Sequence, residues 1–266
     1  NNKYNNNKYN NNKYNNNKMS NIIINQLIED GVAVIKNAYT KEQINNLKEF
    51  GKEIEKKGNE LLFEETIYQT KAQIYNYTTH YDKEICHKKN FYENEKIEII
   101  EIVKGRYDMS LKNCDKDIHT SIEEVVNHLI KPKNRSNTWG LLTSSINSLN
   151  GHWHRDTVNI NGDAEENGDY DDSVMVHCMK PFYFTILIPL VPLNKENGTP
   201  EFIKGSHKLT YQESINNEHI RMDTELGDII IFDGRIFHRG CKNITKEDRP
   251  VLYNIIYRNW YSDNGK

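Results

Sequence analysis

The order of hydrophobic and polar residues divides the chain into a helical first half and a second half of short strands. Apolar positions three and four residues apart predict helices, and strict alternation predicts strands. Thr40 and Gln43 form a capping-box pattern at the start of the second predicted helix, and Pro132 ends the third. Residues 61–90 have no clear period. The helices predicted in this half cover residues 22–31, 40–57 and 121–130, and the strands cover 32–35 and 96–103.

From Trp139 onward, short apolar runs are separated by Gly, Asn, Asp and Pro, which is typical of strands joined by tight turns. Pairs such as Asn197-Gly198 and Asp233-Gly234 tolerate the positive φ of such turns. Because helices come first and a run of strands follows, the pattern predicts an α+β, mainly β fold, a sandwich or jelly roll. The strands predicted here are 139–145, 151–158, 174–178, 182–189, 200–203, 228–232, 235–238 and 251–257.

The first eighteen residues repeat an Asn/Lys/Tyr unit that has almost no aliphatic content. Such a segment cannot bury enough apolar surface to offset its ordering entropy, so we expect residues 1–20 to be a disordered tail and residues 21–266 to form one domain. The formal net charge is -3, and without the four lysines of the tail the folded part carries -7. This charge disfavours nucleic acid as a partner.

Cysteine usage and hydropathy favour a soluble cytoplasmic protein with no membrane partner. No secretory signal precedes the domain, and no run approaches the ~20 apolar residues of a membrane span. The longest apolar run, 182–193, is interrupted by Pro189 and Pro192. The cysteines are scattered and include no C-x-x-C pair. They are Cys86, Cys114, Cys178 and Cys241.

A candidate metal site is found in the segment His154-Arg155-Asp156. On a strand, residues two apart project from the same face, so His154 and Asp156 can bind one cation while Arg155 points away. Alone, an H-x-D pair is more often a hydrogen-bonded surface pair. His238, on a later apolar strand, can supply a third ligand, and two histidines with one carboxylate are typical of non-haem Fe(II) oxygenases. Arg249, just before a strand, is of the type that clamps a carboxylate through a bidentate fork.

Four segments in order strengthen this interpretation: EDGVAVIKNAYTKEQI, HWHRD, ENGTPEFIKGSHK and ELGDIIIFDGRIFHRG. Together they resemble the phytanoyl-CoA dioxygenase-like family of Fe(II)/2-oxoglutarate-dependent oxygenases. The resemblance implies a double-stranded β-helix core with N-terminal flanking helices. It also implies that His154, Asp156 and His238 bind Fe(II) and that Arg249 binds the distal carboxylate of 2-oxoglutarate. Thr185 and Asn147 are further candidates for cosubstrate binding.

The resemblance implies a dioxygenase that uses 2-oxoglutarate and O2 to hydroxylate a C–H bond of a small molecule, with succinate and CO2 as co-products. Halogenating relatives have a small residue in place of the carboxylate, so Asp156 favours hydroxylation. Two alternatives remain open: a protein or peptide side-chain hydroxylase, and a catalytically silent metal-binding β-barrel. The sequence does not identify the substrate or the oligomeric state, and the acidic segment 159–172 is equally consistent with a lid and with a solvated loop.

Four other residues have weaker assignments. His152 is expected to support the site from behind or to be exposed, because three ligands within five residues would strain one strand. His207 is expected to hydrogen-bond a turn. Arg106 is a candidate for substrate contact, although a surface ion pair is favoured. Leu187 stands where family members often have an aromatic residue beside the cosubstrate.

Overall fold

The computed structural model describes residues 20–68, 73–78, 86–94, 96–112, 114, 116–132, 135–157 and 179–261. The low-complexity repeat, the predicted strand 174–178 and the acidic segment 159–172 lie outside the described residues. The predicted extent of the tail and of the domain therefore stays a prediction.

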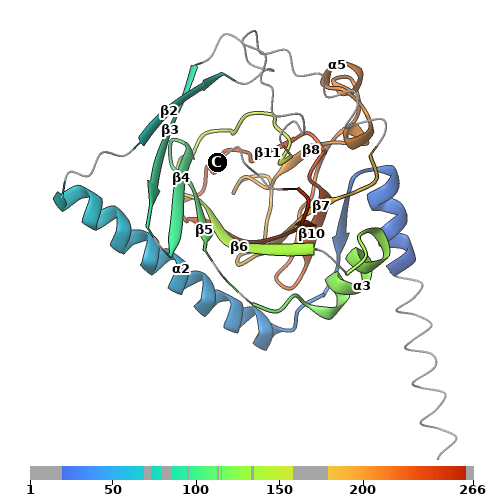
Figure 1. Ribbon diagram of the computed structural model, residues 1–266, viewed down its shortest axis with the longest axis horizontal. Coiled ribbons are helices and arrows are strands. Elements are labelled where there is room, and N and C mark those ends of the chain that lie inside the picture. The colour runs from blue at the N-terminus through green and yellow to red at the C-terminus, as the bar shows by residue number, and fades with distance from the viewer. Residues whose placement is uncertain are drawn as a thin grey trace, which may run out of the picture.

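Two antiparallel sheets form the body of the molecule (Figure 1). The large sheet has the strand order β1-β10-β7-β12-β6-β5-β4-β3-β2, and the small sheet has the order β11-β8-β9. The predicted mainly β fold is therefore confirmed. The strands of the large sheet are β1 (Val32–Ile35), β2 (Gln73–Thr78), β3 (Cys86–Glu93), β4 (Ile97–Val103), β5 (Arg106–Leu111), β6 (Arg135–Ser144), β7 (Tyr183–Pro189), β10 (Ile229–Asp233) and β12 (Arg249–Arg258). Those of the small sheet are β8 (Glu201–Ile203), β9 (His219–Arg221) and β11 (His238–Arg239).

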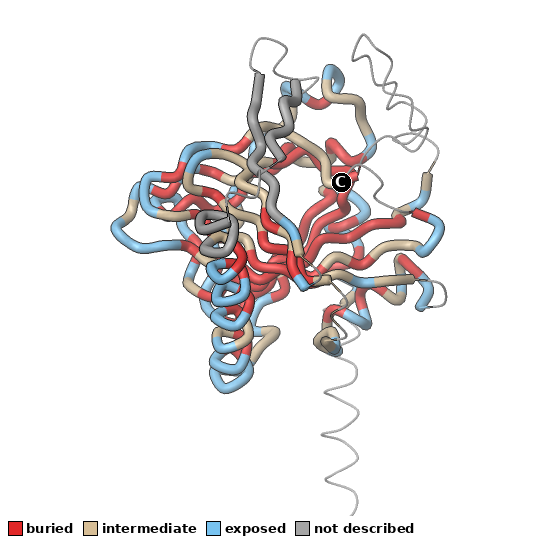
Figure 2. Tube along the Cα trace, turned by 60° about the vertical axis from the view of Figure 1, so that its left-hand side comes forward, coloured by how far each residue is buried: buried red, intermediate tan, exposed pale blue. Residues whose placement is uncertain are grey.

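Helices cover the outer face of the large sheet, as the buried strands beneath exposed helix surfaces in Figure 2 illustrate. The helix α2 (Lys41–Tyr68) places Ile44, Leu47 and Ile54 against the outward-facing residues of the sheet. The capping box predicted at its start is present, since Gln43 and Thr40 exchange hydrogen bonds of 2.8 and 3.2 Å. The other helices are residues 20–29, α3 (Thr120–Leu129), the 3-10 turn η1 (Ser206–Lys208) and α5 (Tyr211–Ser214).

The side chains of β12 alternate between the two faces of the large sheet and so define an outer and an inner core. Leu252 and Ile256 belong to the outer core, under the helices. Val251 and Tyr253 belong to the inner core, which lies between the two sheets and includes Phe202 of β8. This period of two follows from strand geometry, and it puts every second residue of β5, β6, β7 and β12 inside the barrel.

Two strand predictions in the second half were wrong. Residues 151–157 form no regular strand and make a single isolated bridge, from His154 to His238, because the chain bends back at Asp156. Residues 234–236 form a turn in place of the start of a strand. The guanidinium of Arg235 closes that turn, donating to both carboxylate oxygens of Asp233 at 2.8 and 2.6 Å.

Several elements were missed or shortened by the sequence analysis. The strands β2, β3, β5 and β9 were not predicted, and α2 continues eleven residues beyond the predicted end. The missed strands β2 and β3 carry mostly polar side chains, so their pairing comes from main-chain hydrogen bonds and gives little hydrophobic period. Among the described residues, no helix combines the length and hydropathy needed to cross a membrane.

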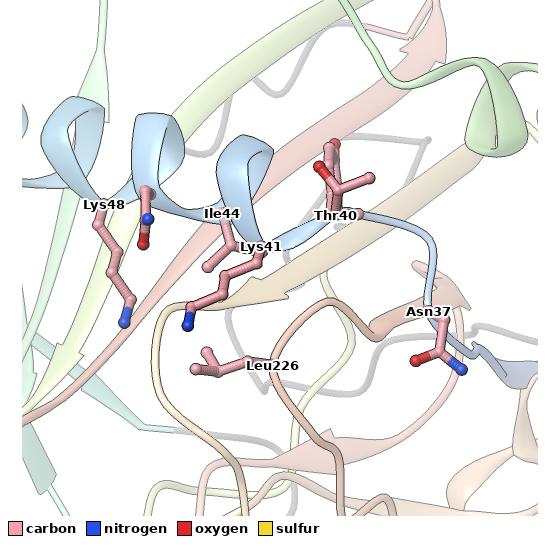
Figure 3. A pocket seen from close by; sticks show the side chains of 8 residues that line it. Asn37, Thr40, Lys41, Ile44, Lys48 and Leu226 are labelled. Carbon is pink, nitrogen blue, oxygen red and sulfur yellow. The ribbon is translucent and has the colours of Figure 1, made fainter.

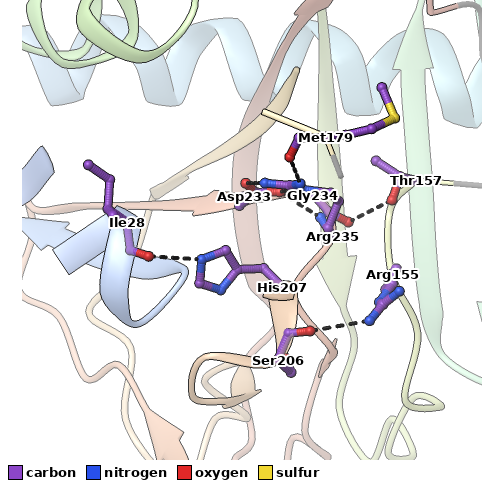
Figure 4. Close-up of polar contacts among 9 residues, drawn as sticks. All are labelled: Ile28, Arg155, Thr157, Met179, Ser206, His207, Asp233, Gly234 and Arg235. Atoms are coloured by element: carbon purple, nitrogen blue, oxygen red, sulfur yellow. Dashed lines mark hydrogen bonds and ion pairs between the residues drawn. The ribbon is translucent and has the colours of Figure 1, made fainter. Parts of the chain in front are cut away.

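His207 fixes the first helix to the turn that follows β8 (Figure 4). Its Nε2–H donates to the carbonyl of Ile28 at 3.2 Å. Because Ile28 belongs to the helix over residues 20–29, the hydrogen bond that was expected to reach a turn reaches the end of a helix instead. The imidazole is 2% exposed, and a Cβ on Gly31 would lie 2.5 Å from its Nδ1. Burial, aided by the nearby charge of Arg235, lowers the pKa of His207 to about 4.

This pKa makes stability depend on pH. Because an unfolded histidine titrates near 6.5, the unfolded chain takes up a proton that the native state refuses until about pH 4. The contribution of His207 to the free energy of unfolding is therefore complete above pH 6.5 and is lost as the pH falls. At pH 5 the free energy of unfolding is about 2 kcal/mol lower than at pH 7. Urea unfolding at both pH values, on wild type and His207→Gln, measures it. An identical pH dependence in the two proteins would contradict the assignment.

Candidate metal centre

Three side chains converge between the two sheets. His154 and His238 lie on segments joined by an antiparallel bridge, and Asp156 follows in the bend after His154. The Oδ1 atom of Asp156 lies 3.7 Å from Nε2 of His154 and 3.4 Å from Nε2 of His238. One ligand atom from each of the three residues lies within 4.8 Å of the other two. The structure thus brings together the three residues that the sequence indicated.

Main-chain carbonyls orient both imidazoles in the same way. Nδ1 of His154 contacts the carbonyl oxygen of His152 at 2.8 Å, and Nδ1 of His238 contacts that of Ile236 at 3.1 Å. Because a carbonyl only accepts, each Nδ1 carries the proton and each Nε2 presents its lone pair toward Asp156. This is the tautomer that a metal-binding histidine needs. His152 contributes its backbone carbonyl here, and a supporting role for its side chain stays a prediction.

Hydrogen bonds hold both the carboxylate of Asp156 and the backbone that carries it. Thr185, on the inner face of β7, donates to Oδ2 at 2.5 Å, which leaves Oδ1 directed at the two imidazoles. The backbone N–H groups of Asp156 and Thr157 both donate to the carbonyl of Gly234, at 2.8 and 3.2 Å. The turn after β10 therefore fixes the bend that carries this ligand, and Figure 4 shows the additional hydroxyl contact of Thr157 to the same carbonyl.

The triad has the composition and access of a cation site. Its ligand atoms are two imidazole Nε2 atoms and one carboxylate oxygen, a set that divalent transition metals accept. Access differs sharply around the site, since the side chain of His154 is 44% exposed and that of His238 only 10%. Phe202 and Phe232 pack on the ring of His238 and keep that side dry. Three ligands on one side leave the other coordination positions free for exogenous ligands.

A separate hollow of about 560 Å³ lies at the start of α2 (Figure 3). It is lined by the β1–α2 connection, the first turns of α2 and Leu226. Its lining includes Lys41 and Lys48 and contains no histidine or carboxylate. This hollow therefore offers no alternative metal site.

Arg249 and Arg106 lie buried side by side, each 2% exposed. The surface ion pair favoured for Arg106 was wrong: its Nε donates to Oγ of Ser144 at 3.0 Å, and its Nη2 donates to the carbonyl of Cys241 at 2.5 Å. Burial, together with the charge of Arg106, lowers the pKa of Arg249 to about 9, and burial lowers the pKa of Arg106 to about 10. Both guanidiniums are still charged at neutral pH.

The other residues singled out from the sequence lie outside the metal-binding triad. Asn147 is an exposed turn residue after β6 with a left-handed backbone, φ 59°, and its assignment to the cosubstrate stays a prediction. Leu187 lies on the inner face of β7, beside Val251 and Tyr253 in the inner core. Arg155 points away from the triad, as expected, and its guanidinium stacks 4.1 Å above the ring of Phe237.

A sequence profile of the family "Phytanoyl-CoA dioxygenase (PhyH)" matches residues 27–251. The chain belongs to this family. The match confirms the resemblance seen in the four sequence segments. It also confirms that the protein is an oxygenase, as the resemblance implied. Two fungal relatives match a shorter segment: dioxygenase af480 of Aspergillus fumigatus, 35% identical over 69 residues, and dioxygenase peniF of Penicillium patulum, 33% identical over 75 residues. These matches span 24% and 27% of this chain, but only 22% and 23% of the two relatives.

Two solved structures share the fold. The epimerase SnoN from nogalamycin biosynthesis superposes with a TM-score of 0.57 at 11% identity, covering 90% of this chain and 83% of that one. HygX from Streptomyces hygroscopicus superposes with a TM-score of 0.54 at 12% identity, covering 89% and 86%. The two-sheet core of this PhyH chain is thus the double-stranded β-helix predicted from sequence.

The contact between Thr185 and Asp156 yields a prediction for this PhyH chain. Thr185→Val removes the hydroxyl at nearly constant volume and frees the carboxylate to rotate, so Fe(II) affinity is expected to fall roughly 10- to 100-fold. Anaerobic titration with Fe(II), or with Co(II) as a stable probe, measures the change. Thr185→Ser keeps the hydroxyl and should bind nearly as wild type does. Equal affinity in Thr185→Val and wild type would show that the bond does not orient the ligand.

Proposed function

We propose that this chain is an Fe(II)- and 2-oxoglutarate-dependent dioxygenase that hydroxylates a C–H bond of a small molecule. The observation that carries the proposal is the convergence of two Nε2 atoms and one carboxylate oxygen within 4.8 Å in a PhyH-family fold. Two imidazoles and one carboxylate are the ligand set of non-haem Fe(II) oxygenases.

Each residue has a defined task in this proposal. His154, Asp156 and His238 hold Fe(II), and Arg249 holds the distal carboxylate of 2-oxoglutarate through its guanidinium fork. When bound, the iron and its cosubstrate supply the oxidation of the C–H bond, with succinate and CO2 as co-products. Thr185 holds the ligand carboxylate in place. We keep Asn147 as a candidate for cosubstrate contact.

The protein must also control water and access. Phe202 and Phe232 exclude water from the His238 side of the site, which protects a reactive centre from side reactions. The more exposed His154 side leaves a route for substrate. Carboxylate ligation by Asp156 occupies the position that would otherwise take a halide, which supports hydroxylation.

Structural relatives support a small-molecule substrate. The solved HygX structure contains nickel, 2-oxoglutarate and hygromycin B, and a SnoN structure contains Fe3+, alpha-ketoglutarate and a nogalamycin compound. These proteins share the fold of this chain at low identity, so the likeness argues for the class of substrate and leaves its identity open.

An anaerobic Fe(II) titration with and without 2-oxoglutarate tests the proposal. Wild type is expected to give a weak visible metal-to-ligand charge-transfer band that requires 2-oxoglutarate. His154→Ala should abolish the band. Arg249→Ala should weaken 2-oxoglutarate binding roughly 10- to 100-fold, because a charge-assisted pair is lost.

Two control variants match these substitutions. His128→Ala removes a histidine of α3, and Arg258→Ala removes an arginine at the far end of β12. Both should keep the band. A folded, iron-loaded wild type without a band would rule out 2-oxoglutarate as cosubstrate and would favour the catalytically silent barrel.

A further inference from the structure

The two histidines of the triad lie in the same tripeptide pattern. Residues 153–155 read Trp-His-Arg, and residues 237–239 read Phe-His-Arg, so that an aromatic residue precedes each histidine and an arginine follows it. Of the ten histidines in the chain, only these two have both neighbours of this kind. A pattern that recurs at both ligands indicates that the flanking residues have a common task.

The bridge between the two histidines brings unlike neighbours together. The two tripeptides run antiparallel, so Trp153 lies opposite Arg239 on one side of the bridge. On the other side, Arg155 lies opposite Phe237. Because the two histidines exchange both main-chain hydrogen bonds, the flanking pairs occupy non-hydrogen-bonded positions, where facing side chains come closest. By strand geometry these side chains project to the face opposite the imidazoles.

Each flanking pair forms a cation–π contact. The guanidinium carbon of Arg239 lies 4.6 Å from the ring centroid of Trp153, and that of Arg155 lies 4.1 Å from the ring centroid of Phe237. Both distances are well inside the reach of about 6 Å over which a ring attracts a cation. One such contact is comparable in strength to one main-chain hydrogen bond of the bridge. We call these four residues the ligand brace.

The small sheet anchors one half of the ligand brace. Nε of Arg239 donates to Oε2 of Glu201 on β8 at 2.8 Å, and Nε of Arg221 on β9 donates to Oε1 at 3.3 Å. Burial raises the pKa of Glu201, but the hydrogen bonds and charges of the two arginines outweigh burial and lower it below its usual value. This carboxylate is therefore ionised at neutral pH and fixes the guanidinium that covers Trp153.

The turn after β8 anchors the other half. Nη2 of Arg155 donates to the carbonyl of Ser206 at 3.2 Å (Figure 4) and to the carbonyl of Leu209. The backbone N–H of Phe237 donates to Oγ of Ser206 at 2.8 Å, and the ring of Tyr211 packs edge-on against the Phe237 ring at 5.1 Å. Arg155 and Phe237 are thus held by the same turn, which fixes the spacing between their two segments.

The bridge needs such support because it is isolated. Residues 151–157 form no regular strand, so no continuous ladder of main-chain hydrogen bonds keeps the segment that carries His154 in register with β11. If the two segments separated, their Nε2 atoms would no longer converge on one point. Contacts that fix the segments before a metal arrives reduce the ordering cost of binding and so raise the affinity.

We propose that the ligand brace positions the two histidine ligands for the metal. Arg155 and Arg239 are its positioning residues, and they act through the aromatic rings of Phe237 and Trp153 on the opposite segment. The inference rests on the proposed function only in requiring a metal at the triad, and it is independent of the cosubstrate. It assigns a task to four residues that lie outside the site and do not touch the metal.

Co(II) titration tests the half of the brace that joins Trp153 and Arg239. Co(II) is an air-stable substitute for Fe(II), and its visible bands report the coordination geometry. Trp153→Leu and Arg239→Gln are each expected to weaken Co(II) binding about 10-fold and to change these bands. The double variant should bind about as weakly as each single variant, because both substitutions remove the same contact. Trp153→Phe keeps a ring and should retain most of the wild-type affinity.

The same titration of Arg155→Gln tests the other half, with the same expected loss. Lys116→Gln is the matched control, because the amine of Lys116 lies 4.5 Å from the ring centroid of Phe50, in a cation–π contact on the helix-covered face of the large sheet. This control should bind Co(II) as wild type does. Urea unfolding without metal shows whether each variant is folded when the titration starts.

The outcomes separate the inference from the proposed function. A wild type that binds neither Co(II) nor Fe(II) would overturn both. If wild type binds Co(II) and folded Trp153→Leu, Arg239→Gln and Arg155→Gln keep its affinity and its bands, only the inference is wrong. An equal loss in Lys116→Gln, or a loss in Trp153→Phe as large as in Trp153→Leu, would also overturn it, because the affinity would then follow general stability. Should Trp153→Leu fail to fold, Arg239→Gln and Arg155→Gln decide the question.

Discussion

The site depends on one reciprocal pair of main-chain hydrogen bonds. The N–H of His154 donates to the carbonyl of His238 and the N–H of His238 donates to that of His154, both at 3.0 Å. Two segments 84 positions apart in sequence are thereby held at the spacing of neighbouring strands, and their imidazoles lie with ring centroids 4.3 Å apart. Every other contact at the site, including the position of the carboxylate, refines a geometry that this bridge establishes.

The bridge places the ligands correctly because the chain departs from strand geometry directly after His154. After His154 the backbone bends, and the N–H groups of Asp156 and Thr157 turn to the carbonyl of Gly234. Continued antiparallel pairing would have placed Asp156 opposite Ile236 instead of in the bend held by Gly234. The prediction of a strand over 151–158 failed for this reason, although the side chains of His154 and Asp156 do converge on one point.

The second half of the fold was largely readable from sequence because its strands are short, apolar and bounded by turn residues. The three metal ligands were predictable because the H-x-D spacing and the residue types together indicate a metal site. The burial of Arg106 was not predictable: this residue begins an alternating segment, RYDMSL, whose pattern suits an exposed strand. Its burial follows only from the register that puts β5 beside β6, and register is a tertiary property that no local pattern contains.

The space between the two sheets has a positive charge at each of its ends. At one end, a divalent cation held by one carboxylate and two neutral imidazoles would keep one net positive charge. At the other end, Arg106 and Arg249 are two buried cations. Between the two ends the lining includes apolar side chains such as Leu187 and Val251. An elongated dianion, with one charge for each end, would bring both ends closer to neutrality, and a five-carbon 2-oxo diacid has that form.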